Sequence, residues 1–449
     1  MFKYLIFFVL GLAFALRSEL GIVTASILYC SYYLFKDFWP FQIKRLDVSS
    51  LFAFALLLNS ISHFIALTSN PADVKNYFLR YVPQYLFEGL AIYHIGAIVI
   101  MESMRYYIKI SWLKYVSATS FTGSWVRMFY ISIFIFTLNF FFAVRSIGSV
   151  GTFSKLIVFG TVFYMSSYVH HYGSKRYLNM LLIYVSFLSF WYLLFAYLRY
   201  EILMPWLAYF LGEAIAKKKL FNFSYKSKVL LFFLVVVIPP LFTYLGKYRG
   251  RIGAGSDKLN SVIEGIDDVD QIKNGETIMS RLSYINQLTH IVRLTRVKGF
   301  YQGETLEYFT YALIPRIFWP EKPQIKQGQW FALETGLALE LESGKANNSL
   351  NMTVPGEFYI NFGWPGVLVG CWLFGCFISF LWNELKGMDV FTWSMRFYFI
   401  FIGMFGMGAD LQLIFTLLAY YIFYKTFKIV LERNDARRPK PLVQSSTYK

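Results

Sequence analysis

The chain has 449 residues, of which 57% are hydrophobic and 21% aromatic, whereas only 15% are charged. A soluble domain carries about 25% charged residues, and apolar runs approaching about 20 residues recur along nearly the whole chain, which excludes a soluble globular protein. The runs lack the strict alternation of a transmembrane barrel and indicate an all-α polytopic membrane protein. The net charge of +17 comes from basic residues that lie between apolar runs, which fits membrane topology and argues against nucleic-acid binding.

The predicted membrane spans begin close to the first residue. Ala13 and Ala15 form a site like that of a cleaved signal peptide, but a second apolar run follows at once, which favours an uncleaved first helix. Ten apolar segments are predicted to span the membrane: 3–16, 19–35, 50–68, 85–101, 127–144, 152–169, 177–196, 201–216, 228–246 and 357–381.

One further apolar stretch, 396–425, is too long for a single span. The glycines in 405–410 permit a turn there, so we predict a hairpin of two helices with Asp410 at its tip. This gives about twelve spans. The cysteines Cys30, Cys371 and Cys376 all lie in apolar segments, and their spacing suits core residues better than a metal motif.

The charges of the links predict the orientation. Short basic loops stay in the cytoplasm, and the basic links follow even-numbered spans, so both chain termini are predicted to be cytoplasmic. The ninth span then leads to a large periplasmic loop whose charges nearly cancel. The predicted regions are transmembrane helices one to nine (1–246), the large loop with short helices (247–356), helices ten to twelve (357–425) and a basic cytoplasmic tail (426–449).

Three short helices are predicted inside the loop. In 277–294, Ile285, Leu288 and Val292 continue an apolar stripe at helical spacing, while Arg281, His290 and Arg293 fall off that stripe. A second helix is predicted for 303–316; it must end before Pro315, because the residue before a proline avoids the α region. The third is predicted for 326–340.

The sequence IPRIFWPEKP, at 314–323, follows the second of these helices. Its three prolines fix the backbone around Arg316, and Phe318 and Trp319 are suited to anchor it at the membrane interface. Arg316 is therefore predicted to be presented by a stiff segment near the headgroups. Such stiffness suits a cation that meets a developing negative charge without reorganising.

This segment, together with TVPGEFYINFGWPGVLVG at 353–370, resembles the Wzy-type O-antigen, or oligosaccharide repeat unit, polymerases. The first motif is similar to their P-R-x-x-W-P-x-K-P signature, and the second to their G-E-x-Y-x-N-F-G-x-x-G sequence at a late membrane helix. The two motifs cover under a tenth of the chain, and the twelve-span plan with one large late loop resembles the family in outline.

The resemblance implies an enzyme of the bacterial inner membrane that joins glycan repeat units carried on undecaprenyl diphosphate, at the periplasmic face. It implies an architecture similar to the lipid-dependent C-type (GT-C) glycosyltransferases, without a metal, nucleotide sugar or other cofactor. The implied partners are the lipid-linked glycan substrates, the lipid bilayer, a chain-length regulator and a flippase.

In the implied reaction a hydroxyl of the incoming unit attacks the anomeric carbon of the growing chain, and undecaprenyl diphosphate leaves with rising negative charge. Arg316 suits a diphosphate clamp, because arginine stays charged and binds phosphate bidentately. Arg281 is a second catalytic candidate, and Arg249, Arg251 and Lys322 are candidates for diphosphate binding. An arginine beside a span can equally contact lipid headgroups or form a structural ion pair.

A general base must accept the proton of the attacking hydroxyl, and Glu357, Asp410 and His290 are the candidates on the outer side. Each has a structural alternative: Glu357 can favour a helix N-terminus, Asp410 can cap or pair, and a lone histidine is more often structural. The other histidines are predicted to lie inside spans or on the cytoplasmic side, too far from the outer surface for this chemistry: His63, His94, His170 and His171.

Three other functions share parts of this pattern. An O-antigen ligase uses the same donor with a different acceptor, but the motif at 314–323 favours a polymerase. A transporter or flippase for lipid-linked glycans would need charges along a central path and commonly shows internal repeats, whereas ionisable residues concentrate here in one loop. A scaffold protein would explain the helices but not the rigid arginine motif.

Overall fold

The computed structural model describes most of the helical part of the chain. The described residues are 2–68, 81–109, 125–141, 149–195, 200–219, 222–225, 227–232, 283–312, 327–338, 349–385, 390–405 and 411–436, with the single positions 314, 319, 321 and 323. Within these ranges the fold is all-α, as predicted, and extended pairing is limited to an isolated bridge between Gln42 and Lys219.

The described elements follow one another as helices joined by short links. They are α1 (Phe2–Ala15), α2 (Glu19–Phe38), α3 (Val48–Thr68), η1 (Pro83–Tyr85), α5 (Leu86–Tyr107), α7 (Trp125–Phe141), α8 (Ser149–Tyr172), α9 (Lys175–Phe195), α10 (Tyr200–Lys217), α14 (Ile285–Lys298), η3 (Glu304–Thr310), α15 (Gln327–Glu334), α16 (Val354–Pro365), η4 (Gly366–Gly370), α17 (Cys371–Glu384), α18 (Val390–Phe405) and α19 (Gln412–Ala436).

The described helices occupy the segments that the apolar runs predict. The long stretch 396–425 falls into two helices, since α18 ends at Phe405 and α19 begins at Gln412. However, α19 continues to Ala436, so the predicted tail 426–449 begins as helix rather than as a separate region. Lysine, glutamate and arginine favour helix in water as well as in a protein, which explains this continuation beyond the apolar run.

Three described stretches are long and apolar enough to cross a membrane: Val48–Thr68, Pro83–Tyr107 and Val354–Glu384. Phe2–Ala15 and Trp125–Leu138 are apolar but shorter. The helix α2 contains Lys36 and Asp37 near its end. The described helices thus indicate a membrane protein. Among the described residues, fewer helices are long and apolar enough to cross a membrane than the predicted count of about twelve.

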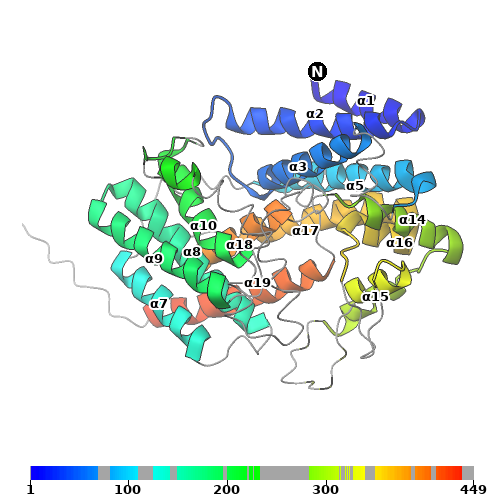
Figure 1. Ribbon diagram of the computed structural model, residues 1–449. Helices are drawn as coiled ribbons and strands as arrows, with labels where there is room; N and C mark the ends of the chain where they lie inside the picture. The colour runs from blue at the N-terminus through cyan, green and yellow to red at the C-terminus, as the bar shows by residue number, and fades with distance from the viewer. Residues whose placement is uncertain are drawn as a thin grey trace, which may run out of the picture.

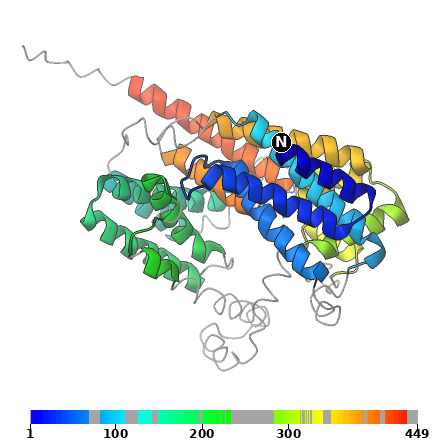
Figure 2. The same ribbon diagram turned by 90° about the horizontal axis from the view of Figure 1, so that it is seen from above.

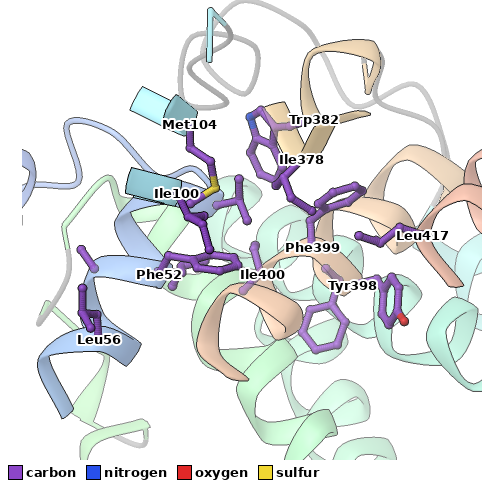
Figure 3. Packing of buried hydrophobic residues seen from close by; sticks show 14 of the residues in the cluster. Phe52, Leu56, Ile100, Met104, Ile378, Trp382, Tyr398, Phe399, Ile400 and Leu417 are labelled. Atoms are coloured by element: carbon purple, nitrogen blue, oxygen red, sulfur yellow. The ribbon is translucent and has the colours of Figure 1, made fainter. Parts of the chain in front are cut away.

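The helices form two groups that α18 joins. The helices α7, α8, α9 and α10 lie together on one side, and α1, α2, α3, α5, α14, α16 and α17 lie on the other (Figures 1 and 2). The contacts of α18 extend to α8 in the first group and to α3 in the second. Figure 3 shows the apolar core at this junction, where Phe52, Ile100, Ile378, Phe399 and Leu417 are fully buried.

The helix that follows the large loop is kinked. Gly363 has φ 62° and ψ −150° inside α16, and Pro365 and the π-helical turn η4 precede the regular helix α17. The ring of Phe300 lies so close to Gly363 that a Cβ there would come within 2.9 Å of it. Glycine is therefore required both by the positive φ and by the approach of the loop.

The loop helix α14 is buried between α5 and α16 rather than lying on the surface. Ile285, Leu288 and Val292 are buried, which confirms the predicted stripe, and Arg293 is exposed. The prediction that His290 lies off the buried face is wrong, because its exposed fraction is 5%. Contacts with two neighbouring helices widen the buried surface beyond one stripe.

The other two predicted loop helices are present but shorter. The second is the 3₁₀ helix η3, which ends at Thr310 and so stops before Pro315, as predicted. The third is α15, which covers the first part of the predicted range 326–340.

Candidate functional site

Most of the candidate residues from the sequence lie outside the described residues, and the structure places two of them. Glu357 stands in the first turn of α16, and His290 stands in α14. Those outside the described residues are Arg316, Arg281, Asp410, Arg249, Arg251 and Lys322.

A tight cap begins α16 and fixes the position of Glu357. Thr353 has φ 66°, which is unusual for a β-branched residue, and its side chain accepts a hydrogen bond from Gly356 N at 3.2 Å. Pro355 follows in the first turn, where a missing N–H costs nothing. The N–H of Glu357 then donates to Thr353 O at 2.9 Å. Backbone strain of this kind is concentrated at functional sites.

The carboxylate of Glu357 joins three separate segments. Its Oε1 accepts a hydrogen bond from the Tyr308 hydroxyl at 3.0 Å, and its Oε2 accepts one from Leu411 N at 2.8 Å. The side chains of Glu357 and Tyr308 are fully buried. Glu357 therefore links η3, α16 and the residue that precedes α19.

The segment before η3 is hydrogen-bonded along α16. Tyr301 N donates to Ile360 O, and Gln302 N donates to Asn361 O, both at 3.0 Å. The Asn361 side chain accepts from Gly303 N at 3.0 Å and donates to Thr305 Oγ1 at 2.7 Å. It also donates to the backbone oxygen of Glu357 at 2.8 Å, so both of its N–H groups are used.

The two described candidates flank one close contact between helices. A Cβ at Gly356 would lie 2.6 Å from Ile291 Cδ1, so α14 and α16 can approach this closely only because Gly356 is a glycine. His290 precedes Ile291 in the sequence, and Glu357 follows Gly356. The contact thus brings the α14 candidate and the α16 candidate to the same junction.

The chain on either side of the arginine motif is held by aromatic contacts. The rings of Phe309 and Phe415 are 4.5 Å apart, which ties η3 to α19. Tyr311 and Trp319 are 6.3 Å apart and nearly perpendicular, so the described residues before and after Arg316 in the sequence come back together. Trp319 is 39% exposed and remains available for contact with lipid or sugar.

A second polar cluster lies where α5 begins. Glu88 accepts hydrogen bonds from the Tyr359 hydroxyl at 2.5 Å and from Arg296 Nη2 at 3.0 Å. The carboxylate raises the pKa of the Arg296 guanidinium, and the Arg296 side chain remains 60% exposed. This cluster ties α14 and α16 to the start of α5.

The structure places His63 in α3 and His94 in α5, inside two stretches that are long and apolar enough to span a membrane, as predicted. Their rings meet between these helices, and His63 Nε2 accepts a hydrogen bond from the backbone N–H of Tyr284, the residue before α14. The sequence did not predict this contact with the segment 277–294. The pairing of these histidines has no signal in local sequence, since they are far apart along the chain.

The arrangement can position charge and protons, but the described residues do not themselves form a metal centre. In the described part of the chain no group of three or more His, Cys, Asp or Glu could hold a metal ion. In comparisons with protein-family models, curated proteins and solved structures, no match to this chain was found.

Proposed function

We propose that this protein polymerises undecaprenyl-diphosphate-linked oligosaccharide repeat units into O-antigen or a related polysaccharide. The observation that best supports this is the junction at Glu357. The segment that leads into the first motif (301–310) is hydrogen-bonded to the second motif through Glu357 and Asn361. The residues that lead into one of the two motifs therefore contact the other motif.

In the proposed reaction, a hydroxyl oxygen of the incoming unit forms a bond to the anomeric carbon of the growing chain. The bond from that carbon to the diphosphate oxygen breaks, and undecaprenyl diphosphate leaves with the electron pair. Arg316 is proposed to bind the diphosphate as its charge rises, because a positioned cation stabilises a developing anion most in a dry site. Arg249, Arg251, Arg281 and Lys322 are proposed to support this clamp.

The attacking hydroxyl loses its proton to a base. Each oxygen of the Glu357 carboxylate accepts a hydrogen bond from the protein itself, and the side chain is buried. We therefore assign a structural role to Glu357, which holds the site together. We propose that either Asp410 or His290 accepts the proton. Single variants of these two residues distinguish between them. With this assignment, the Glu357 carboxylate holds the segments together and does not need to contact the sugar.

The proposed setting is the bacterial inner membrane, with the site on the periplasmic side and both termini in the cytoplasm. A GT-C-like arrangement of about twelve spans belongs to this proposal, as do a chain-length regulator and a flippase as partners. Support comes from the apolar helices and from the position of α14 and η3, which both precede the long apolar stretch Val354–Glu384.

The deciding experiment uses purified full-length protein in detergent with a defined undecaprenyl-diphosphate repeat unit, and it resolves products as a ladder on a gel. Wild type is expected to give a ladder. Arg316→Ala and Arg316→Lys are both expected to lose at least about a hundredfold in rate, because a lysine cannot replace bidentate binding of a phosphate. Arg293→Ala is the matched control, since Arg293 is an exposed arginine on α14.

Each outcome has a separate meaning. A ladder from wild type that persists in Arg316→Ala would return Arg316 to a structural role and leave the polymerase proposal standing. Transfer of a single unit to a lipid A acceptor, without a ladder, would indicate a ligase. Movement of the lipid-linked unit across vesicles without any transfer would indicate a flippase and would overturn the proposal.

A further inference from the structure

Two buried histidines meet between α3 and α5, apart from the junction at Glu357. His63 Nδ1 and His94 Nε2 are 3.0 Å apart, and both side chains are fully buried. His63 Nε2 accepts a hydrogen bond from Tyr284 N at 3.4 Å. The remaining ring nitrogen, His94 Nδ1, is buried without a hydrogen-bond partner among the described residues.

The hydrogen-bond directions fix where the protons are. A backbone N–H can only donate, so His63 Nε2 carries no proton. Neutral His63 then has its proton on Nδ1 and donates it to His94 Nε2, which leaves the proton of His94 on Nδ1. The neutral pair thus holds two protons. One lies in the bridge between His63 Nδ1 and His94 Nε2, and the other is on His94 Nδ1. His63 Nε2 carries only a lone pair.

An additional proton has one place to go. The bridge already holds a proton and His94 Nδ1 already carries one, so uptake by either ring ends with a proton on His63 Nε2, directly or by a shift across the bridge. That nitrogen then faces the N–H of Tyr284 as a second donor. The hydrogen bond is lost and two donors oppose each other in a buried place, which is strongly unfavourable.

Tyr284 matters because it precedes the first residue of α14 and helps to seat that helix. Its ring packs against Tyr93 at 5.7 Å, and burial raises the pKa of the Tyr284 hydroxyl to about 12. Leu288, one turn later, lies against Gly89 of α5. Ile291 then lies against Gly356, beside Glu357. The hydrogen bond at His63 is therefore the first of a series of contacts that hold α14 in place.

In the part of the chain that the structure describes, no neighbouring negative charge compensates the positive charge that the histidine pair gains when it binds a proton. The neighbouring titratable side chains are neutral in their ordinary state, and the charged ones on the packed helices are engaged elsewhere. The neutral ones are Tyr93 on α5, Tyr284, Cys30 on α2 and Cys371 on α17 against Gly96. On α5 the charged side chains are Glu88 with Tyr359 and Arg296, Glu102 with Lys3 and Tyr29, and Arg105 with Asp37. On α14, α16 and α18 they are the exposed Arg293 and Lys298, Glu357 with Tyr308 and Leu411 N, and Arg396, which donates to Leu385 O.

We propose that His63 and His94 form an acid-sensitive latch that holds the start of α14 in the helix bundle, and that binding of one proton releases it. The hydrogen bond between His63 Nε2 and Tyr284 N is the latch itself. Release frees the end of α14 nearest to α3 and loosens the contact between α14 and α16. The inference does not rest on the proposed glycosyl transfer, and it is tested without substrate.

Hydrogen–deuterium exchange of the full-length protein in detergent tests the latch. Exchange of peptides within 284–298 is measured from pH 8 to about pH 2, because burial disfavours the charged form of a histidine, and it is corrected for the intrinsic pH dependence of amide exchange. In wild type the corrected exchange is expected to rise about tenfold or more as the pH falls. In His63→Gln it is expected to stay flat, because the glutamine oxygen can accept from Tyr284 N near the position of Nε2 but takes up no proton.

A second variant and a control keep the test decisive. His94→Gln removes the bridging partner, and it is expected to shift or abolish the transition even if His63→Gln does not fold. His171→Gln changes an exposed histidine of α8 and is expected to leave the transition unchanged. A wild-type profile without a transition, or a transition that persists unaltered in both pair variants, would overturn the proposal.

Discussion

The hydroxyl of Tyr308 donates a hydrogen bond to Glu357 Oε1 across 3.0 Å, and both side chains are fully buried. This pair connects the 3₁₀ helix before the arginine motif to the first turn of α16. The other carboxylate oxygen accepts from Leu411 N, so the same residue also fixes the start of α19. The stability of the junction therefore depends on groups far apart in sequence, and single substitutions test each connection.

Removal of the Tyr308 hydroxyl is expected to destabilise the protein. In Tyr308→Phe one oxygen of a buried carboxylate loses its donor, which costs about 1–3 kcal/mol of unfolding free energy. Thermal unfolding in detergent, followed by intrinsic fluorescence, checks this. Tyr225→Phe is the control, because Tyr225 is 82% exposed and is expected to behave like wild type. Equal melting temperatures for all three proteins would contradict the prediction.

The approach of α14 to α16 depends on the absence of a side chain at Gly356. Gly356→Ala would place a Cβ 2.6 Å from Ile291 Cδ1, and overpacking of this kind costs about 1–3 kcal/mol. Ile291→Val removes that methyl group, so the double variant is expected to recover part of the loss. The measurement is a double-mutant cycle of unfolding free energies.

Gly11→Ala is the control for the Gly356 series. A Cβ at Gly11 in α1 meets nothing within 4 Å, so alanine there is expected to be neutral or to stabilise the helix by up to about 1 kcal/mol. If Ile291→Val gives no recovery in the Gly356→Ala background, the two helices do not meet as described.

Asn361 holds the segment 301–305 against α16, and Asn361→Asp is expected to release it. The carboxylate cannot donate, so the carbonyl of Glu357 loses its donor and meets a negative charge instead. Amide exchange of a peptide spanning 300–312 is expected to increase. Asn351→Asp adds the same charge at an exposed position and serves as the control; similar exchange in both variants would show that Asn361 is not the anchor.

The two partners of Glu88 are expected to differ in importance. Arg296 is 60% exposed, so Arg296→Ala should change the unfolding free energy by less than about 1 kcal/mol, as is usual for surface ion pairs. Tyr359 is buried, and Tyr359→Phe should cost about 1–3 kcal/mol. Unfolding measured at low and at high salt separates them, because only the Arg296 contribution should weaken with salt. A larger effect from Arg296→Ala would reverse the ranking.

The sequence by itself determined where the described helices lie, because apolar runs, helical spacing and proline act over a few residues. The break between Phe405 and Gln412, the end of η3 before Pro315 and the buried stripe of α14 all follow from such local patterns. The extension of α19 to Ala436 was missed, since charged helix formers continue a helix without an apolar signal.

The tertiary structure alone decided which polar residues meet. Glu357 was singled out by its motif, but its bonds to Tyr308 and Leu411 cross 49 and 54 positions of the sequence. His63 was predicted to lie inside a span, which its position in α3 fits, but the return of the chain to it at Tyr284, 221 positions later, was not predicted. No local pattern encodes such contacts, because they form only when segments far apart in the chain pack together and exchange water for buried hydrogen-bond partners.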